Sequence, residues 1–272
     1  MHLWLHVGSH KTGTTSIQAT FAKSRDALSL TGLNYPRNYL QKYYSIRDKS
    51  AHHYIAQSIS SGELKLHIDA IGQHTDVQEV LLSSERFDYV SRANIGLLPE
   101  ALSPVFSSVS VIIYVREPVS LATSRGQQRL KRGIGTYADV CAHPPFYDYK
   151  ETIEKWVDLF GKDNVKVRVF AKDMLVGGDV VDDLLHQTGR DASTLELHRK
   201  WRNTGISLQA ALAISARKRE NPEFEPVRDA RELLEIPGDP FTLPPDAQER
   251  IRRRARPGLL WLREHYGIDF LD

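Results

Sequence analysis

The stretch that decides the fold is His2–Ser16, HLWLHVGSHKTGTTS. Its apolar part, Leu3–Val7, suits a short buried strand, and it lacks the charged start and small-residue cleavage site of a signal peptide. Residues 8–16 carry two glycines, a lysine and several hydroxyls, and apolar residues then recur at helical spacing as far as Leu28. The sequence therefore predicts a strand, a glycine-containing loop and a helix, in that order.

This order predicts an anion-binding site. The N–H groups of the loop and the positive end of the helix converge on one point. Lys11 adds a full positive charge, Gly13 permits a close approach, and Thr14, Thr15 and Ser16 add hydroxyl donors. Helix capping alone would explain one hydroxyl, but not the lysine together with three hydroxyls.

The position of the lysine narrows the choice of anion. A Walker A loop has its lysine directly after the second glycine, whereas Lys11 precedes Gly13, and the dinucleotide pattern G-x-G-x-x-G is absent. The segment KTGTTS resembles the 5′-phosphosulfate loop of sulfotransferases that use 3′-phosphoadenosine-5′-phosphosulfate (PAPS). The resemblance implies that this whole segment binds the cofactor, namely Lys11, Thr12, Gly13, Thr14, Thr15 and Ser16.

Two later segments extend the resemblance. The apolar run VSVIIYV ends at Arg116, and Ser124 follows about two turns into a helix that Pro118 can begin. This spacing resembles the motif that holds the 3′-phosphate in sulfotransferases. The donor-rich segment HRKWRNTGIS is similar to a late basic loop of bacterial polysaccharide sulfotransferases, which implies cofactor contacts from Arg202 and Asn203.

The catalytic residues are expected at the carboxyl ends of parallel strands, where ligands bind in open α/β sheets. We expect Lys11 to stabilise the charge that grows on the leaving phosphate during sulfuryl transfer. The strand VLL ends in Ser84-Glu85, where the resemblance implies a general base, and Glu85 fits that role. His10, inside the loop, and His6, just before it, are alternative bases.

Composition limits which partners, membrane segments and metal sites the chain can have. The chain has 272 residues, 41% of them hydrophobic, and 36 basic against 34 acidic residues, which gives no case for a nucleic-acid partner. It contains no apolar run long enough for a membrane span, and Cys141 is its single cysteine. Histidines 52, 53, 67 and 74 have no recognisable ligand spacing, so we expect packing or solvated roles and no metal.

We therefore expect an α/β protein with a three-layer architecture, in which helices flank a mostly parallel, P-loop-like sheet. It would form a single sulfotransferase domain, with residues 1–205 as the α/β core and 206–272 as a helical extension. The basic run RIRRRAR near the C-terminus is interpreted as a solvated helix face.

The expected function is transfer of a sulfuryl group from PAPS to an acceptor hydroxyl, with 3′,5′-adenosine bisphosphate (PAP) as product and without a metal. Resemblance to bacterial enzymes favours a carbohydrate acceptor and a cytoplasmic bacterial enzyme, with a small hydroxylated metabolite as the second choice of acceptor. Two alternatives remain open, namely a non-catalytic module that binds PAP or a glycan and a P-loop phosphotransferase.

Overall fold

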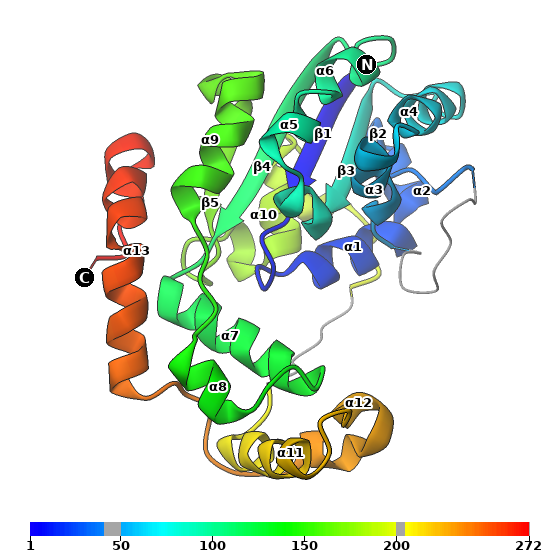
Figure 1. Cartoon of the computed structure of the whole chain (residues 1–272). Coiled ribbons are helices and arrows are strands. Elements are labelled where there is room, and N and C mark those ends of the chain that lie inside the picture. The colour runs from blue at the N-terminus through cyan, green and yellow to red at the C-terminus, as the bar shows by residue number, and fades with distance from the viewer. Residues whose placement is uncertain (41–49, 200–204, 272) are drawn as a thin grey trace. The chain divides into compact units, whose positions relative to one another are not determined.

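The apolar stretch at the start of the chain forms the central strand of a parallel sheet (Figure 1). The computed structural model describes residues 1–40, 50–199 and 205–271. Neighbouring strands of the described sheet all run parallel, in the order β2-β3-β1-β4-β5. Their bounds are His2–Val7 (β1), Leu33–Asn34 (β2), Glu79–Ser84 (β3), Ser108–Val115 (β4) and Val165–Val169 (β5). The α/β prediction is confirmed.

β1 lies in the centre because both of its faces are buried. Leu3, Leu5 and Val7 alternate onto one face and are at most 2% exposed, while Trp4 packs on the opposite face. Such two-sided burial is characteristic of parallel strands covered by helices.

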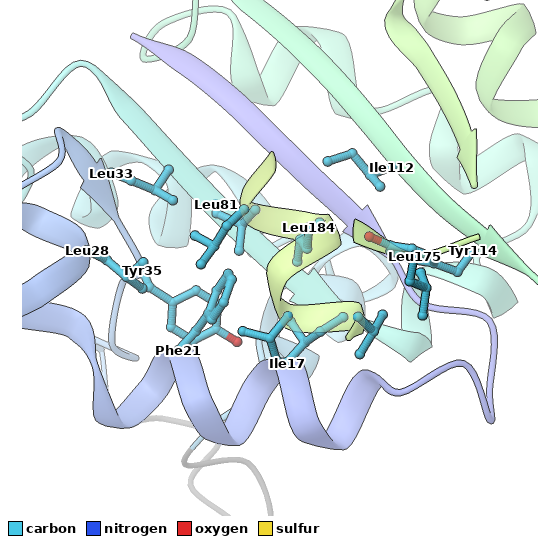
Figure 2. Packing of buried hydrophobic residues seen from close by; sticks show 13 residues of the cluster. Ile17, Phe21, Leu28, Leu33, Tyr35, Leu81, Ile112, Tyr114, Leu175 and Leu184 are labelled. Atoms are coloured by element: carbon cyan, nitrogen blue, oxygen red, sulfur yellow. The ribbon is translucent and has the colours of Figure 1, made fainter. Parts of the chain in front are cut away.

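One face of the sheet packs against α1 (Thr14–Lys23) and α10 (Val180–Gln187). Figure 2 shows Ile17 and Phe21 of α1 pointing at Leu81 of β3, with Leu184 of α10 beside them. This packing holds α1 against the sheet, with its first turn next to the loop at the carboxyl end of β1.

The opposite face is covered by helices from the middle of the chain (Figure 1). The 3₁₀ helix Glu85–Tyr89 follows β3, and its Phe87 packs edge-on against Trp156. The elements in this layer are α3 (His53–Ser61), α4 (Leu64–Gln73), α5 (Arg92–Ile95), α6 (Leu98–Leu102) and α9 (Tyr149–Phe160). Helices on both faces give the three layers that the sequence predicts.

The chain divides into two compact units. The first comprises Met1–Val115 with Glu151–Trp201 and contains the sheet; the second comprises Arg116–Lys150 with Arg202–Asp272. The predicted boundary at residue 205 lies close to the third and last division between the units, after residue 201, whereas no sequence pattern indicated the separate grouping of residues 116–150. A single domain with a C-terminal extension stays a prediction.

The second unit is helical around its own apolar core, which includes Leu130, Val140, Ile214 and Phe241. Thr136 and Asp139 form a capping box at the start of its α8. Its helices are α7 (Pro118–Lys131), α8 (Tyr137–Ala142), α11 (Leu208–Glu220), α12 (Pro226–Asp229) and α13 (Pro245–Tyr266).

The helix expected through Leu28 is divided in two. α1 ends at Lys23, and α2 spans Arg25–Ser29. Ser24 leaves the helical region at φ −109° and ψ 26°, and its hydroxyl accepts a hydrogen bond from the main-chain nitrogen of His198 over 2.9 Å. A distant segment of the chain therefore holds the break.

Candidate functional site

The loop between β1 and α1 has a closely packed shape. The hydroxyl of Thr12 is buried and donates to the carbonyl oxygen of Ser9 over 2.6 Å. A Cβ at Gly8 would lie 2.4 Å from the Thr14 methyl, and one at Gly13 would lie 2.6 Å from Val180 Cγ1. Both glycines are therefore required by close contacts, and Thr12 acts inside the loop to hold the turn.

The loop ends in an open helix N-terminus. Gly13, at φ 78°, is the N-cap of α1, and it provides no side-chain oxygen for the first N–H groups of the helix. Lys11 also adopts a left-handed conformation, at φ 72°. Alternation of left-handed residues with their neighbours can turn successive N–H groups into an anion-binding concavity. Thr15, exposed at the first turn, adds a hydroxyl that an anion in solution can reach.

Glu85 begins beside this loop. Val7 of β1 is the register partner of Ser84 of β3, and the nitrogen of Gly8 donates to the Ser84 carbonyl over 3.2 Å. A Cβ at Gly8 would lie 3.4 Å from the Glu85 Cα. The parallel register thus brings Glu85 and the Lys11 loop to one edge of the sheet, as the sequence predicts.

The Glu85 carboxylate is held from two sides. Gln18 Nε2 of α1 donates to Oε2 over 2.9 Å, and His53 Nε2 of α3 lies 3.7 Å from Oε1. Burial raises the pKa of Glu85, but the Gln18 hydrogen bond and the charges of His53 and His10 outweigh it, so the net pKa is lowered. Glu85 is therefore ionised at neutral pH.

The two rival histidines differ in their surroundings. His10 is half-buried, and its ring centre lies 5.3 Å from that of Tyr89. His6 is fully buried, with Nδ1 2.8 Å from Ser83 Oγ, and burial lowers the pKa of His6 to about 4. A ring enclosed in the sheet in this way does not reach an acceptor, so His10 is the remaining histidine alternative.

The residues expected at the 3′-phosphate belong to the second unit. Arg116 is half-buried, and its Nε donates to Ser120 Oγ over 2.9 Å, one turn before Ser124 on α7. Tyr149 donates its hydroxyl to the Arg116 carbonyl. Burial lowers the pKa of Arg116, although the guanidinium remains charged at any physiological pH. Arg202 and Asn203 lie outside the described residues.

Two residues of this site were missed by sequence reasoning. Gln18 lies four positions after Thr14 and so on the same face of α1, a signal that could have been noticed. His53 was grouped with three histidines expected to pack or to face solvent. Its approach to Glu85 depends on α3 packing against β3, which no local pattern reports.

The described residues contain neither a metal-binding cluster nor a membrane-spanning helix. Over the described residues, no group of three or more His, Cys, Asp or Glu side chains is placed to hold a metal ion. Within that same part of the chain, no helix is both long enough and apolar enough to cross a membrane.

Comparisons with known proteins give little further information. No family model and no curated protein matches the chain. Among solved structures, a sulfotransferase from Alicyclobacillus acidocaldarius aligns over 98% of this chain and 96% of its own, with 14% identity and a TM-score of 0.42.

Proposed function

We propose that this protein transfers a sulfuryl group from PAPS to an acceptor hydroxyl, in a cytoplasmic bacterial setting and without a metal. The observation that carries the proposal is the pairing, at one sheet edge, of a lysine-bearing anion loop with an ionised carboxylate. The lysine-bearing loop can stabilise the negative charge of a leaving phosphate. The carboxylate can accept the proton that the acceptor hydroxyl loses.

The loop fits a phosphate group on physical grounds. The α1 N-terminus has no side-chain cap, and the close packing at Gly8 and Gly13 keeps the loop backbone in a fixed shape. The proposed ligands are Lys11, Gly13 and the first turn of α1, including Thr15 and Ser16. Arg116 and Ser124 are proposed to bind the 3′-phosphate, because a guanidinium fork matches two phosphate oxygens.

The proposed chemistry follows the movement of charge. The acceptor oxygen forms a bond to sulfur as its proton passes to the Glu85 carboxylate. The bond between sulfur and the bridging oxygen breaks, and its electron pair stays on the 5′-phosphate. Lys11 stabilises that negative charge, which is greater in the transition state than in the ground state.

We propose a carbohydrate as the acceptor, with a small hydroxylated metabolite as the second candidate. The proposal rests on the resemblance of the late donor-rich segment to bacterial polysaccharide sulfotransferases. A screen of saccharides and small alcohols with labelled PAPS tests it directly.

Thermal-shift titration separates the proposal from its alternatives. Stabilisation by PAP without a metal supports the sulfotransferase, whereas stabilisation only by ATP with Mg²⁺ would favour a phosphotransferase. Binding of PAP without any transfer in the acceptor screen would favour a non-catalytic module.

The role of Glu85 has its own test. Glu85→Gln should lower kcat by about 10²–10⁴, the range for loss of a general base, and leave PAP affinity nearly unchanged. A more acidic acceptor hydroxyl needs less help from a base, so it should restore part of this loss. Lys11→Ala should show no such rescue. If neither variant responds to acceptor acidity, His10 becomes the candidate base.

A further inference from the structure

The ring of His53 lies between the serine and the glutamate that end β3. Its Nδ1 is 2.7 Å from Ser84 Oγ, and its Nε2 is 3.7 Å from Glu85 Oε1. His53 is the first residue of α3 and only 9% exposed, and Ser84 is fully buried. The ring therefore has one nitrogen toward each of two neighbouring residues.

The hydroxyl of Ser84 determines which nitrogen of that ring carries the proton. Ser84 Oγ already accepts a hydrogen bond from the main-chain nitrogen of Arg86 over 3.0 Å. A buried hydroxyl proton requires an acceptor, and an N–H group cannot supply one. Among the residues that the structure describes, the remaining side-chain contact of Ser84 is His53 Nδ1. Ser84 therefore donates its proton to Nδ1.

This hydrogen bond fixes the form of the imidazole. With Nδ1 as acceptor, the proton of the neutral ring is on Nε2, on the side of Glu85. The imidazolium also has a proton on Nε2. We infer that His53 is a positioning residue whose Nε2–H faces Glu85 Oε1 in both protonation states and keeps the carboxylate ionised and oriented.

The consequence for catalysis rests on the proposed function. At 3.7 Å the contact is longer than a hydrogen bond, so it acts through electrostatic attraction, while Gln18 holds the other oxygen. Since Nε2 already carries a proton, His53 does not receive one from Glu85. Glu85 is then a single carboxylate base and not half of a proton relay.

Other titratable groups also act on Glu85. They are His10 from the loop, His6 from β1 and Tyr35, which follows β2. The experiment must therefore change His53 alone and compare variants that differ in which ring nitrogen they replace.

Two substitutions separate the contacts of the ring. His53→Asn places an amide near the position of Nδ1 and removes the group that faces Glu85, whereas His53→Gln places an amide near Nε2. His74→Gln, on α4, is the control for loss of a histidine. In the pH profile of kcat/KM, we expect the midpoint of the acid limb to move up by about 1 pH unit in His53→Asn and by less in His53→Gln. In the control it should stay in place. A purely structural role would leave all the limbs in place and would overturn the inference.

Two NMR measurements on the full chain test the inference without any assay. The ¹⁵N shifts of His53 should report protonation at Nε2 and not at Nδ1 in the neutral ring. The side-chain carboxyl ¹³C shift of Glu85 should titrate at higher pH in His53→Asn than in the wild type. An Nδ1-protonated ring, or an unchanged Glu85 midpoint, would overturn the inference even if sulfuryl transfer is found. The expected NMR results without any transfer would instead count against the proposed function alone.

Discussion

The main-chain nitrogen of Gly8 donates a hydrogen bond to the carbonyl oxygen of Ser84 over 3.2 Å. This bond continues the parallel pairing of β1 and β3 one residue past Val7, so the loop that carries Lys11 and the turn that carries Glu85 start from a shared point. The backbone of the sheet therefore sets the placement of the loop relative to the turn. Substitution of the Lys11 or Glu85 side chain should leave this placement intact.

Lys11 combines a charge with a strained backbone, and two substitutions separate these features. Lys11→Ala and Lys11→Gly both remove the ammonium, so each should lower kcat by about 10²–10³, the range for loss of one transition-state donor. Only glycine relieves the φ of 72°, so Lys11→Gly should exceed Lys11→Ala in free energy of unfolding by about 1 kcal/mol. Steady-state kinetics and urea unfolding measure the two effects. Equal stabilities would contradict the strain at Lys11, and unchanged kcat would contradict its catalytic role.

Gly13 and Gly62 form a matched pair for the packing of the loop. Their φ values are 78° and 76°, but a Cβ at Gly13 would meet Val180 and Phe170, whereas one at Gly62 would meet no described atom within 4 Å. Backbone strain should be similar in the two alanine variants, and the cost of overpacking should fall on Gly13→Ala alone. We expect Gly13→Ala to be less stable than Gly62→Ala by about 1–3 kcal/mol in urea unfolding. Equal losses would mean that α10 can move away from the loop.

Arg116 should discriminate between nucleotides with and without a 3′-phosphate. Arg116→Ala should weaken PAP binding by about 1.5–3 kcal/mol, the scale of a hydrogen bond to a charged group, and hardly change the affinity for adenosine 5′-phosphate. Isothermal titration calorimetry measures the affinity for each of the two nucleotides. Arg217→Ala, an exposed position on α11, is the control and should bind both as the wild type does. A similar loss of both ligands in Arg116→Ala would assign Arg116 a structural role.

Ser120 offers a graded version of that experiment. Its hydroxyl accepts from Arg116 Nε, so Ser120→Ala should release the guanidinium without removing its charge. We expect a smaller loss of PAP affinity than in Arg116→Ala, by calorimetry under the same conditions. A loss as large as that of Arg116→Ala would show that Ser120 itself contacts the ligand.

His52 should contribute to acid sensitivity of the fold. The main-chain nitrogen of Ser83 donates a hydrogen bond to His52 Nδ1 over 2.9 Å, and His52 Nε2 lies 3.0 Å from the carbonyl oxygen of Pro36. Because Nδ1 accepts a hydrogen bond, the ring must be neutral. Burial lowers the pKa of His52 from 6.5 to about 3. Because the folded pKa is below the unfolded one, the unfolded chain binds the proton first, and stability falls as pH decreases from about 6.5 toward 3.

A titration-free variant measures this contribution. His52→Gln should be less stable than the wild type at pH 7.5, but it should lose about 1–2 kcal/mol less between pH 7.5 and pH 5. Urea unfolding at the two pH values gives the comparison, with His74→Gln as the control. The same pH dependence in wild type and His52→Gln would show that His52 does not carry the effect.

The sequence predicted those parts of the fold whose signals are local. Leu3–Val7 is continuously apolar and is followed by glycines and hydroxyls, which is sufficient to predict β1, the loop and α1. The position of Glu85 beside the loop also followed, because parallel strands end at one edge of a sheet. These inferences need only the strand assignments and one general property of parallel sheets.

The remaining features depend on contacts between distant segments. The break at Ser24 is held by His198, and the approach of His53 to Glu85 needs α3 to pack on β3. Thr12 looked like a ligand by its place in the motif, yet its hydroxyl donates to Ser9 inside the loop. A pattern of residue types does not distinguish a hydroxyl that faces a ligand from one that closes a turn.

The central place of β1 also affects how the chain is made. β1 leaves the ribosome well before its neighbours in the sheet, since Leu5 pairs with Leu82 and Val111, which lie much later in the chain. Until then an apolar strand with two unsatisfied edges is exposed to solvent, and pairing over such sequence separations is slow. A nascent chain stalled before residue 79 should therefore bind chaperones through Leu3–Val7, and it should lose that binding once β3 and β4 have been synthesised.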